Sequence, residues 1–508
     1  YVQDDVDGLD TATWLNAQPW FDRQHGFGVL GDSYPGSTAL SLAETNPPNL
    51  KAAYLSFVSA NYHEDGAWRG GAFELAHNVF FTAVTACPQR IERATTHAPL
   101  KPVLPGGGDI AALFTLETAT PLDQPLLSDN CPWYRDWLLN SDENNYWDRV
   151  GLNHAAFFDR LPPIPMAFMT GWYDQFLGGT ILDYQGAPAD TSLTLGPWVH
   201  EGMDHPTAGD GYFGEAATDD RLNDELQWFN RYLKGTSDGG PQPGTVRYFL
   251  MGGGTQHAAA GQIDIGGVWQ TTTTWPPPDV HDVPYYLRTD GVLSTVPPRA
   301  ETPDQFTYDP ANPVPTAGGN ISSGSVFAPA GAYVQRCHRD WPMCGGSIYD
   351  LSSRDDVLSY QTDALDNDLP VAGPVSVELW ASSDAADTDF TAKLVDVYPN
   401  GDAVNVADGI VRARYRDVST EPEFISPGVP TRYVIDLWHT AALFKAGHRL
   451  RVDISSSNFP HFDRNLNTGA QIGSDSLDDA VVATQTIFHD GVRASRIILP
   501  ILPSTSQP

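Results

Sequence analysis

The chain has 508 residues, enough for about two to four domains, and carries 63 acidic against 29 basic side chains, a net charge of −34. Such a negative field repels nucleic acid and anionic membrane surfaces, so neither is an expected partner. The sequence contains no run of about 18 apolar residues, so no transmembrane helix is predicted.

The amino-terminal part of the chain predicts alternating helices and strands. Residues 9–20 place apolar side chains at helical spacing before Pro19, and residues 37–44 also have a helix-like pattern. Residues 27–30 and 52–58 are short apolar runs of the kind that forms buried strands. This alternation predicts a parallel α/β sheet.

Residues 31–36 form a G-x-S-x-x-G turn between a predicted strand and a predicted helix. This is the setting of a nucleophile elbow, in which glycines allow a sharp turn that exposes the serine hydroxyl. Ser33 is therefore the candidate nucleophile, and the backbone N–H of Tyr34 is a candidate oxyanion donor. The usual elbow is G-x-S-x-G, and Pro35 holds the place of the second glycine here. The alternative is a loop in which Ser33 only caps the following helix.

From about residue 63 the pattern changes, and residues 68–84 and 109–116 are predicted to be helical. We expect residues 63–155 to form a helical cap, whose aromatic side chains either line a substrate pocket or pack the cap onto the body. These aromatic residues are Trp133, Tyr134, Trp137, Tyr146 and Trp147.

Two later strands each end next to a polar side chain that suits catalysis. The apolar run 164–170 is followed by Asp174, and the run 191–195 is followed by His200. The carboxyl ends of parallel strands lie at one edge of a sheet, where such side chains converge. The chain order Ser33, Asp174, His200 is that of an α/β-hydrolase triad, although each acid or histidine alone could be an ordinary turn residue.

The rest of the chain predicts one more helix and then a β domain. Residues 222–234 place apolar side chains on one helical face, which we expect to pack on the sheet; they are Leu222, Leu226, Phe229 and Leu233. Short alternating runs then predict a β-sandwich or jelly roll, with strands at 375–380, 390–397, 433–437 and 450–454.

The four cysteines leave two interpretations open. An even count fits two disulfides in an exported protein, and it also fits four thiols in a cytoplasmic enzyme. We favour disulfides and export weakly, and the sequence does not decide which cysteines pair. Cys337, His338 and Cys344 offer too few ligands at recognised spacing for a zinc site, so no metal is expected. The remaining cysteines are Cys87 and Cys131.

With these residues in hand, the chain resembles the cocaine-esterase-type (CocE/NonD) serine hydrolases, a group that includes X-Pro dipeptidyl-peptidases, α-amino-acid ester hydrolases and glutaryl-cephalosporanate acylases. The resemblance covers nearly the whole chain. It rests on the turns at 31–36, 171–174 and 196–200, and on motifs of the β domain at 306–316, 387–394, 455–460 and 464–469.

The resemblance implies an α/β-hydrolase body with an inserted helical cap and a C-terminal all-β jelly-roll domain. We expect the body at residues 1–62 and 156–236, the cap at 63–155 and the jelly roll at 237–508. Family members carry a longer stretch before the serine, including a tyrosine that donates to the oxyanion. That tyrosine has no match here, so we expect a separate amino-terminal segment, or a sheet without its first strands.

The expected reaction is hydrolysis of a carboxylic ester through an acyl-enzyme, with no cofactor. Amide or peptide hydrolysis, as by an X-Pro dipeptidyl-peptidase or a β-lactam side-chain acylase, is the alternative, and an inactive subunit with a binding jelly roll is another. The expected partner is a small ester or amide substrate, with homo-oligomerisation also open. Candidate substrate-binding residues are Glu64, Asp65, Trp68 and Trp172.

Overall fold

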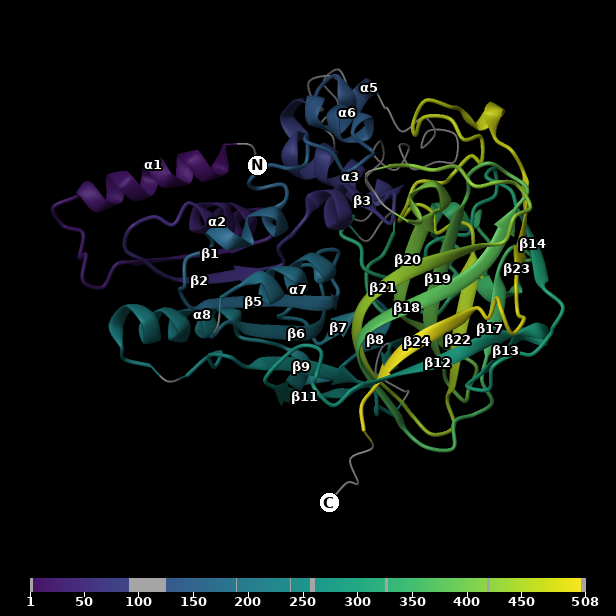
Figure 1. The fold of residues 1–508 in the computed structure, drawn as a ribbon. Helices are drawn as coiled ribbons and strands as arrows, with labels where there is room; N and C mark the ends of the chain where they lie inside the picture. The colour runs from purple at the N-terminus through teal and green to yellow at the C-terminus, as the bar shows by residue number, and fades with distance from the viewer. Residues whose placement is uncertain are drawn as a thin grey trace. The chain divides into compact units, whose positions relative to one another are not determined.

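The computed structural model describes residues 3–90, 125–188, 190–237, 239–255, 261–324, 328–417 and 421–503. It forms two compact units, which are coloured along the chain in Figure 1. The first comprises Tyr1–Gly66 and Asn144–Asp279, and the second Ala67–Glu143 and Val280–Pro508. The helix predicted at residues 109–116 lies outside the described residues.

The first unit is built on a sheet of six strands. In spatial order these are β1 (Phe27–Asp32), β2 (Leu50–Ser56), β5 (Met166–Tyr173), β6 (Ser192–Val199), β9 (Val246–Met251) and β11 (Gly267–Thr272). The first five pair in parallel and β11 pairs antiparallel to β9 (Figure 1). The predicted parallel α/β sheet is therefore confirmed. Strands β9 and β11 lie beyond residue 236, so the sheet of the body continues past its predicted end.

Helices pack against this sheet and on one another. The main ones are α1 (Asp4–Ala17), α2 (Tyr34–Glu44), α7 (Leu177–Gly186) and α8 (Arg221–Phe229). Shorter elements are the π-helices His63–Ala67 and Asn230–Lys234, the 3₁₀ helices His154–Arg160 and Glu215–Ala217, and strands β7 (Thr207–Ala208), β8 (Gly211–Tyr212) and β10 (Ile263–Asp264). Helix α1 starts before the predicted residue 9, and it ends two residues before Pro19.

The predicted apolar face of α8 is wrong for its two leucines but right for Phe229, which packs against the core of the sheet. Leu222 and Leu226 are 69% and 56% exposed, whereas Trp228 is fully buried and Glu225 nearly so. Trp228 packs edge-on against Tyr54 of β2, with ring centroids 6.4 Å apart. The helix thus packs on the sheet as expected, but through Trp228 and Phe229, while Leu222 and Leu226 face away from it.

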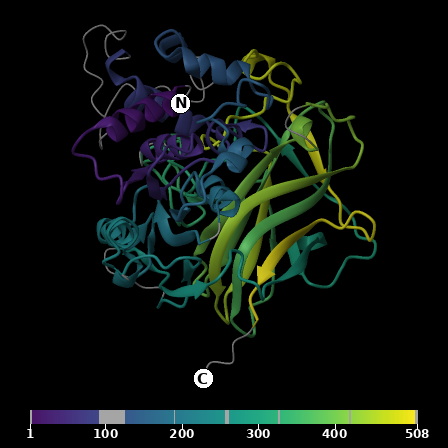
Figure 2. The same cartoon turned by 60° about the vertical axis from the view of Figure 1, so that its left-hand side comes forward.

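The second unit is dominated by long antiparallel strands, drawn in green and yellow in Figure 2. Strand β18 (Leu369–Ser383) pairs with β21 (Thr431–Phe444), β23 (Ala483–Ile487) and β24 (Arg496–Ile501). Strand β19 (Asp389–Val397) pairs with β20 (Ala403–Arg412) and β22 (Arg449–Ser455). The other strands described within residues 280–508 are β12 (His281–Arg288), β13 (Val292–Ser294), β14 (Asp304–Tyr308), β15 (Arg336–Cys337), β16 (Tyr349–Asp350) and β17 (Leu358–Gln361).

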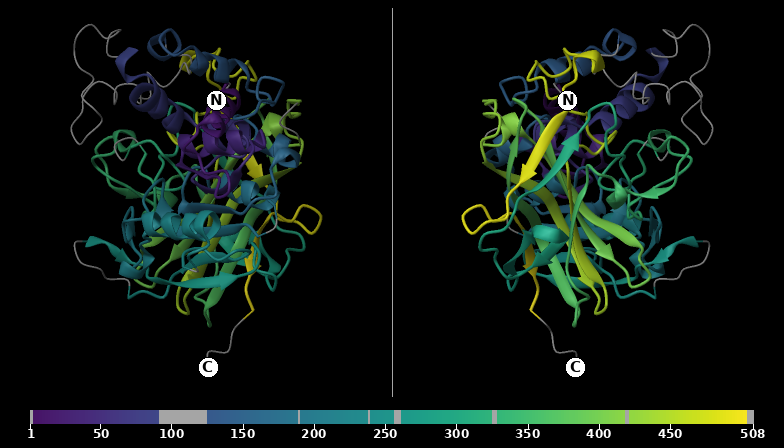
Figure 3. Two further views of the ribbon diagram at one scale, coloured as in Figure 1. Left: turned by 90° about the vertical axis from the view of Figure 1, so that its left-hand side faces the viewer. Right: turned by 90° about the vertical axis from the view of Figure 1, so that its right-hand side faces the viewer.

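Segments far apart in the sequence pair in this unit. The yellow strand β24 lies beside the teal strand β12 (Figure 3), with His281 opposite Ile501 and Tyr286 opposite Arg496. All four predicted strands lie within β18, β19, β21 and β22. The antiparallel β domain is therefore confirmed, while its jelly-roll connectivity stays a prediction. Its small 3₁₀ turns are Thr289–Gly291, Pro342–Cys344, Leu351–Ser353, Ala413–Tyr415 and Leu477–Asp479.

The continuous helix predicted at residues 68–84 is wrong in its first half. This stretch begins with a hairpin of β3 (Trp68–Arg69) and β4 (Ala72–Phe73). Both connecting residues, Gly70 and Gly71, have positive φ, which permits the tight turn and excludes helix there. Helical structure follows in α3 (Leu75–Phe80), the π-helix Phe81–Ala86, α5 (Pro125–Ser128) and α6 (Pro132–Leu139).

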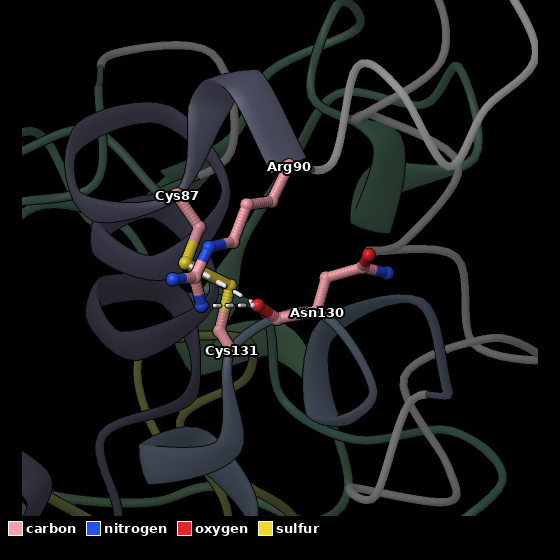
Figure 4. The surroundings of a disulfide bond; sticks show 4 residues. All are labelled: Cys87, Arg90, Asn130 and Cys131. Carbon is pink, nitrogen blue, oxygen red and sulfur yellow. Dashed lines mark hydrogen bonds between the residues drawn. A yellow bond between two sulfur atoms is a disulfide. The ribbon is translucent and has the colours of Figure 1, made fainter.

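Two disulfides join the four cysteines. One links Cys87 to Cys131 and the other links Cys337 to Cys344. Figure 4 shows the first, beside which the Arg90 guanidinium donates a hydrogen bond to the Asn130 carbonyl oxygen at 3.2 Å. The cysteines are thus paired, as the interpretation with two disulfides predicts. None of the described helices has the length and apolar character needed to cross a membrane.

Candidate active site

Ser33 occupies the sharp turn between β1 and α2. Its backbone has φ of 57° and ψ of −131°, a conformation that few non-glycine residues adopt. A Cβ atom on Gly31 would lie 2.3 Å from the Pro35 carbonyl carbon, and one on Gly36 would lie 2.8 Å from the Gly31 oxygen. Both glycines are therefore required by the close approach of the backbone.

The Ser33 side chain does not cap helix α2, which contradicts the capping alternative. Instead its Oγ lies 2.9 Å from His200 Nε2. His200 Nδ1 lies 2.7 Å from Asp174 Oδ1, and the Thr170 hydroxyl donates to Asp174 Oδ2 at 2.7 Å. The three predicted catalytic side chains are thus joined by hydrogen bonds into one network within the first unit. This network lies at the carboxyl ends of β1, β5 and β6.

Two aromatic rings flank the His200 imidazole. The rings of Phe57 and Phe176 each lie 5.5 Å from it, centroid to centroid, at an interplanar angle of 69°. Phe57 is fully buried and has φ of 56°. Such an energetically costly backbone persists only where the surroundings enforce it, often at functional sites. The rings limit rotation of the imidazole while its two nitrogens bond Asp174 and Ser33.

Charged neighbours set the pKa of His200. Burial lowers this pKa, whereas the hydrogen-bonded Asp174 carboxylate and the nearby Glu201 and Asp32 carboxylates raise it. The opposing effects leave the pKa of His200 above its ordinary value of 6.5. The imidazole therefore takes up a proton readily, as a general base must, and loses that capacity as the pH falls.

Tyr34 is the first residue of α2, so its amide belongs to the positive end of a helix dipole. This position suits an amide that stabilises a developing oxyanion beside Ser33. The Tyr34 phenol donates to the Asp4 carboxylate oxygens at 3.1 and 3.2 Å. Burial and the Asp4 charge raise the pKa of Tyr34 to about 12, so the phenol stays protonated. This link ties α1 to the elbow.

The candidate substrate-binding residues have structural partners. Trp172 is buried, donates to the Phe249 carbonyl oxygen at 2.8 Å and packs against Trp275. Trp68, in the second unit, is buried and donates to the Trp137 carbonyl oxygen at 3.3 Å. The two tryptophan side chains thus contribute to packing within their units.

The two acidic candidates differ in burial. Asp65 is nearly fully buried and accepts hydrogen bonds from the Ser59 hydroxyl and the Ala60 amide. Burial raises the pKa of Asp65 to about 7, against these hydrogen bonds, which lower it. Glu64 is half-buried and lies 2.9 Å from His63 Nδ1. Asp65 therefore stabilises a turn, and Glu64 keeps the more accessible carboxylate.

Sequence reasoning missed several residues around the site. Thr170 supports Asp174, Phe57 and Phe176 flank His200, and Arg221 forms an ion pair with Asp32. Thr170 could have been found, since it lies four residues before Asp174 at the end of the same apolar run. The aromatic contacts and the ion pair join distant segments, and no local pattern signals them.

The parallel sheet, its helices and the separate antiparallel β unit define an α/β-hydrolase with a C-terminal β domain. Residues 1–202 match the family model of the X-Pro dipeptidyl-peptidases (S15 family), and residues 241–498 match that of the X-Pro dipeptidyl-peptidase C-terminal non-catalytic domain. The chain is 34% identical over 528 residues to cocaine esterase of Rhodococcus sp. (strain MB1 Bresler), covering 99% of this chain and 85% of that protein.

Solved structures show the same fold. An α-amino acid ester hydrolase superposes with a TM-score of 0.77 at 24% identity, covering 98% of this chain and 80% of that one. An aminopeptidase from a marine sediment archaeon, Thaumarchaeota archaeon, superposes with a TM-score of 0.75 at 22% identity, with the same coverage of both chains. The chain belongs to the family of serine hydrolases that contains cocaine esterase, which confirms the resemblance drawn from its motifs.

Proposed function

We propose that this hydrolase cleaves carboxylic esters, with Ser33 as nucleophile, His200 as general base and Asp174 as the group that orients the imidazole. The observation that carries the proposal is the hydrogen-bonded chain from Ser33 Oγ through His200 to Asp174 Oδ1, with distances of 2.9 and 2.7 Å. This is the arrangement that activates a serine hydroxyl for attack on an acyl carbonyl.

The reaction proceeds in two halves. His200 Nε2 takes the proton of Ser33 as Oγ attacks the carbonyl carbon, and Asp174 stabilises the imidazolium that forms. The Tyr34 amide donates to the oxyanion, and His200 returns the proton to the departing alcohol. Water then attacks the acyl-enzyme with His200 again as base, which releases the acid and restores Ser33. None of these steps requires a metal or an organic cofactor.

Amide or peptide hydrolysis is the second candidate. The match of residues 1–202 to the X-Pro dipeptidyl-peptidase family favours it. A dipeptidyl-peptidase or a β-lactam side-chain acylase of this kind needs carboxylates that hold a substrate ammonium group. Glu64 is the more accessible of the two proposed acids, since Asp65 is committed to backbone hydrogen bonds. An inactive subunit with a binding jelly roll is the third candidate, and the assembled hydrogen bonds at Ser33 weigh against it.

The organisation around the site also remains a proposal. We propose that residues 63–155 act as a cap, and that the jelly roll lies within residues 280–508, because β9 and β11 belong to the sheet of the first unit. Trp172 in the first unit and Trp68 in the second each support their own unit through packing. Strand β1 pairs with β2 alone among the described strands. Its other edge is open to a strand from an amino-terminal segment or a second copy.

The test combines active-site labelling with substrate screening. The purified chain is treated with a fluorophosphonate probe, and the site of any adduct is located by intact mass and peptide mapping. A single adduct on Ser33, absent from Ser33→Ala, supports the nucleophile assignment. Turnover of p-nitrophenyl esters, compared with matched anilides and an X-Pro anilide, then separates esterase from peptidase. A folded chain with no adduct would refute the proposal.

A further inference from the structure

Helix α8 touches strand β1 at two points on one face of the strand. Gly28 and Asp32 are four residues apart, so their side-chain positions point the same way. A Cβ atom on Gly28 would lie 2.2 Å from the Phe229 ring, which shows how closely the end of α8 approaches the strand. At the other end, Arg221 Nη1 lies 2.6 Å from Asp32 Oδ2.

The spacing of these contacts matches the geometry of both elements. Four strand residues span about 13 Å, and the eight residues from Arg221 to Phe229 span about 12 Å of helix. Helix α8 therefore runs antiparallel to β1 and is held at both ends. The missing side chain of Gly28 admits the Phe229 ring. The ion pair lies at the end of the strand that carries Ser33.

Arg221 also lies among carboxylates near the catalytic base. It pairs with Asp32 and, four residues along the same helix, with Glu225. Asp32 directly precedes Ser33, whose Oγ lies 2.9 Å from His200 Nε2, and Glu201 directly follows His200. Both carboxylates raise the pKa of His200. The Arg221 and Asp32 side chains are only 22% and 20% exposed, so solvent screens their pairing incompletely. Burial raises the pKa of Asp32, and the Arg221 charge opposes that shift.

We propose that Arg221 is a positioning residue of the hydrolase site, which fixes the nucleophile strand against α8 through Asp32 and neutralises a carboxylate close to His200. The inference rests on the proposed roles of Ser33 and His200. Asp32 and Arg221 form a pair of opposite charges, and either charge without the other would shift the pKa of His200. A pair that only stabilises the fold would leave the base unaffected.

The two single substitutions should move the base in opposite directions. Arg221→Gln leaves the Asp32 carboxylate uncompensated, which favours the imidazolium and moves the acid limb of the pH profile upward. Asp32→Asn removes a carboxylate that raises the His200 pKa and leaves Arg221 paired with Glu225 alone, which moves that limb downward. A unit charge about 10 Å away, at an effective dielectric constant of about 40, corresponds to roughly 0.6 pH units. The double variant should lie near the wild type, because neither charge remains.

The experiment measures the second-order rate of fluorophosphonate labelling, and kcat/KM for a p-nitrophenyl ester, from pH 5 to 9. Each is measured for the wild type, Arg221→Gln, Asp32→Asn and the double variant. Arg221→Lys keeps the charge, so its acid limb should stay at the wild-type position even if Arg221→Gln folds poorly. Arg231→Gln is the matched control, since that guanidinium donates to the carbonyl oxygens of Gly239 and Pro241.

The result expected is an upward shift for Arg221→Gln, a downward shift for Asp32→Asn, and cancellation in the double variant. The inference is overturned if the two single variants shift in the same direction, or if neither shifts while Ser33 is still labelled. It is also overturned if Arg231→Gln shifts as much as Arg221→Gln. A wild-type chain that is folded but not labelled would instead refute the proposed nucleophile, so the two failures are distinguishable.

Discussion

Trp228→Ala should destabilise the first unit strongly, because Trp228 anchors α8 to the sheet. The Trp228 side chain is fully buried. Its ring packs edge-on against the rings of Tyr54 and Tyr232, with centroids 6.4 and 4.7 Å away. A buried tryptophan removes about 200 Å² from water, worth roughly 5 kcal/mol at 25 cal/mol/Å². Measured truncations of this kind cost about 3–5 kcal/mol.

Leu226→Ala is the matched control on the same helix. Leu226 is 56% exposed and lies on the face that leucine spacing alone would bury. Its truncation should change the free energy of unfolding by less than about 1 kcal/mol, as for other surface positions. The pair of variants therefore tests which face of α8 contacts the sheet.

The assay is urea unfolding of the full chain, followed in parallel by far-UV circular dichroism and by fluorophosphonate labelling of Ser33. Labelling reports on the unit that contains α8. Trp228→Ala should lose labelling at a clearly lower urea concentration than the wild type, while Leu226→Ala should coincide with it. Equal losses for both variants, or a larger loss for Leu226→Ala, would refute the packing described for α8.

Three further predictions concern the site, a buried acid and a disulfide. Asp174→Asn should lower kcat about 10⁴-fold, because it removes the acceptor that sets the His200 tautomer; a loss below tenfold in steady-state ester hydrolysis would contradict this. Asp65 has a pKa raised to about 7 from 3.8, so the stability associated with its neutral form is lost as the pH rises through about 7. Asp65→Asn should therefore raise the free energy of unfolding by up to about 4 kcal/mol relative to the wild type at pH 8, and by little at pH 4. Urea unfolding midpoints measured at both pH values would check this. Replacing Cys87 and Cys131 together by serine opens a loop with a sequence separation of 44, which should cost about 4 kcal/mol of unfolding free energy; an unchanged midpoint would contradict this.

The catalytic geometry was predictable because local sequence encodes it. The elbow at Ser33 requires glycines on both sides of a tight turn, and the structure shows backbone contacts that exclude any side chain at Gly31. Asp174 and His200 follow buried apolar runs, and parallel pairing of β5 with β6 brings the ends of those runs together. Buried strands that run parallel were therefore enough to predict that Ser33, Asp174 and His200 lie close together.

The orientation of α8 was not predictable in the same way. Its leucines have ideal helical spacing, yet Leu222 remains 69% exposed, whereas Trp228 is fully buried and Phe229 packs against the same core. Helical periodicity identifies a possible apolar face, whereas the free energy depends on the area that a partner surface can cover. The hairpin at Gly70 was missed for a related reason, since positive φ at a glycine outweighs the helical pattern on either side.

Two kinds of residue surround Ser33. The groups that perform the proposed chemistry lie at strand ends and can be identified from motifs. The groups that tune it, such as Arg221 on Asp32 and the Phe57 ring on His200, come from segments more than 140 residues away in the chain. Their effect depends on packing, which no single segment encodes. Family motifs thus transfer the reaction to a new chain, whereas the pH range of that reaction has to be worked out from its own structure.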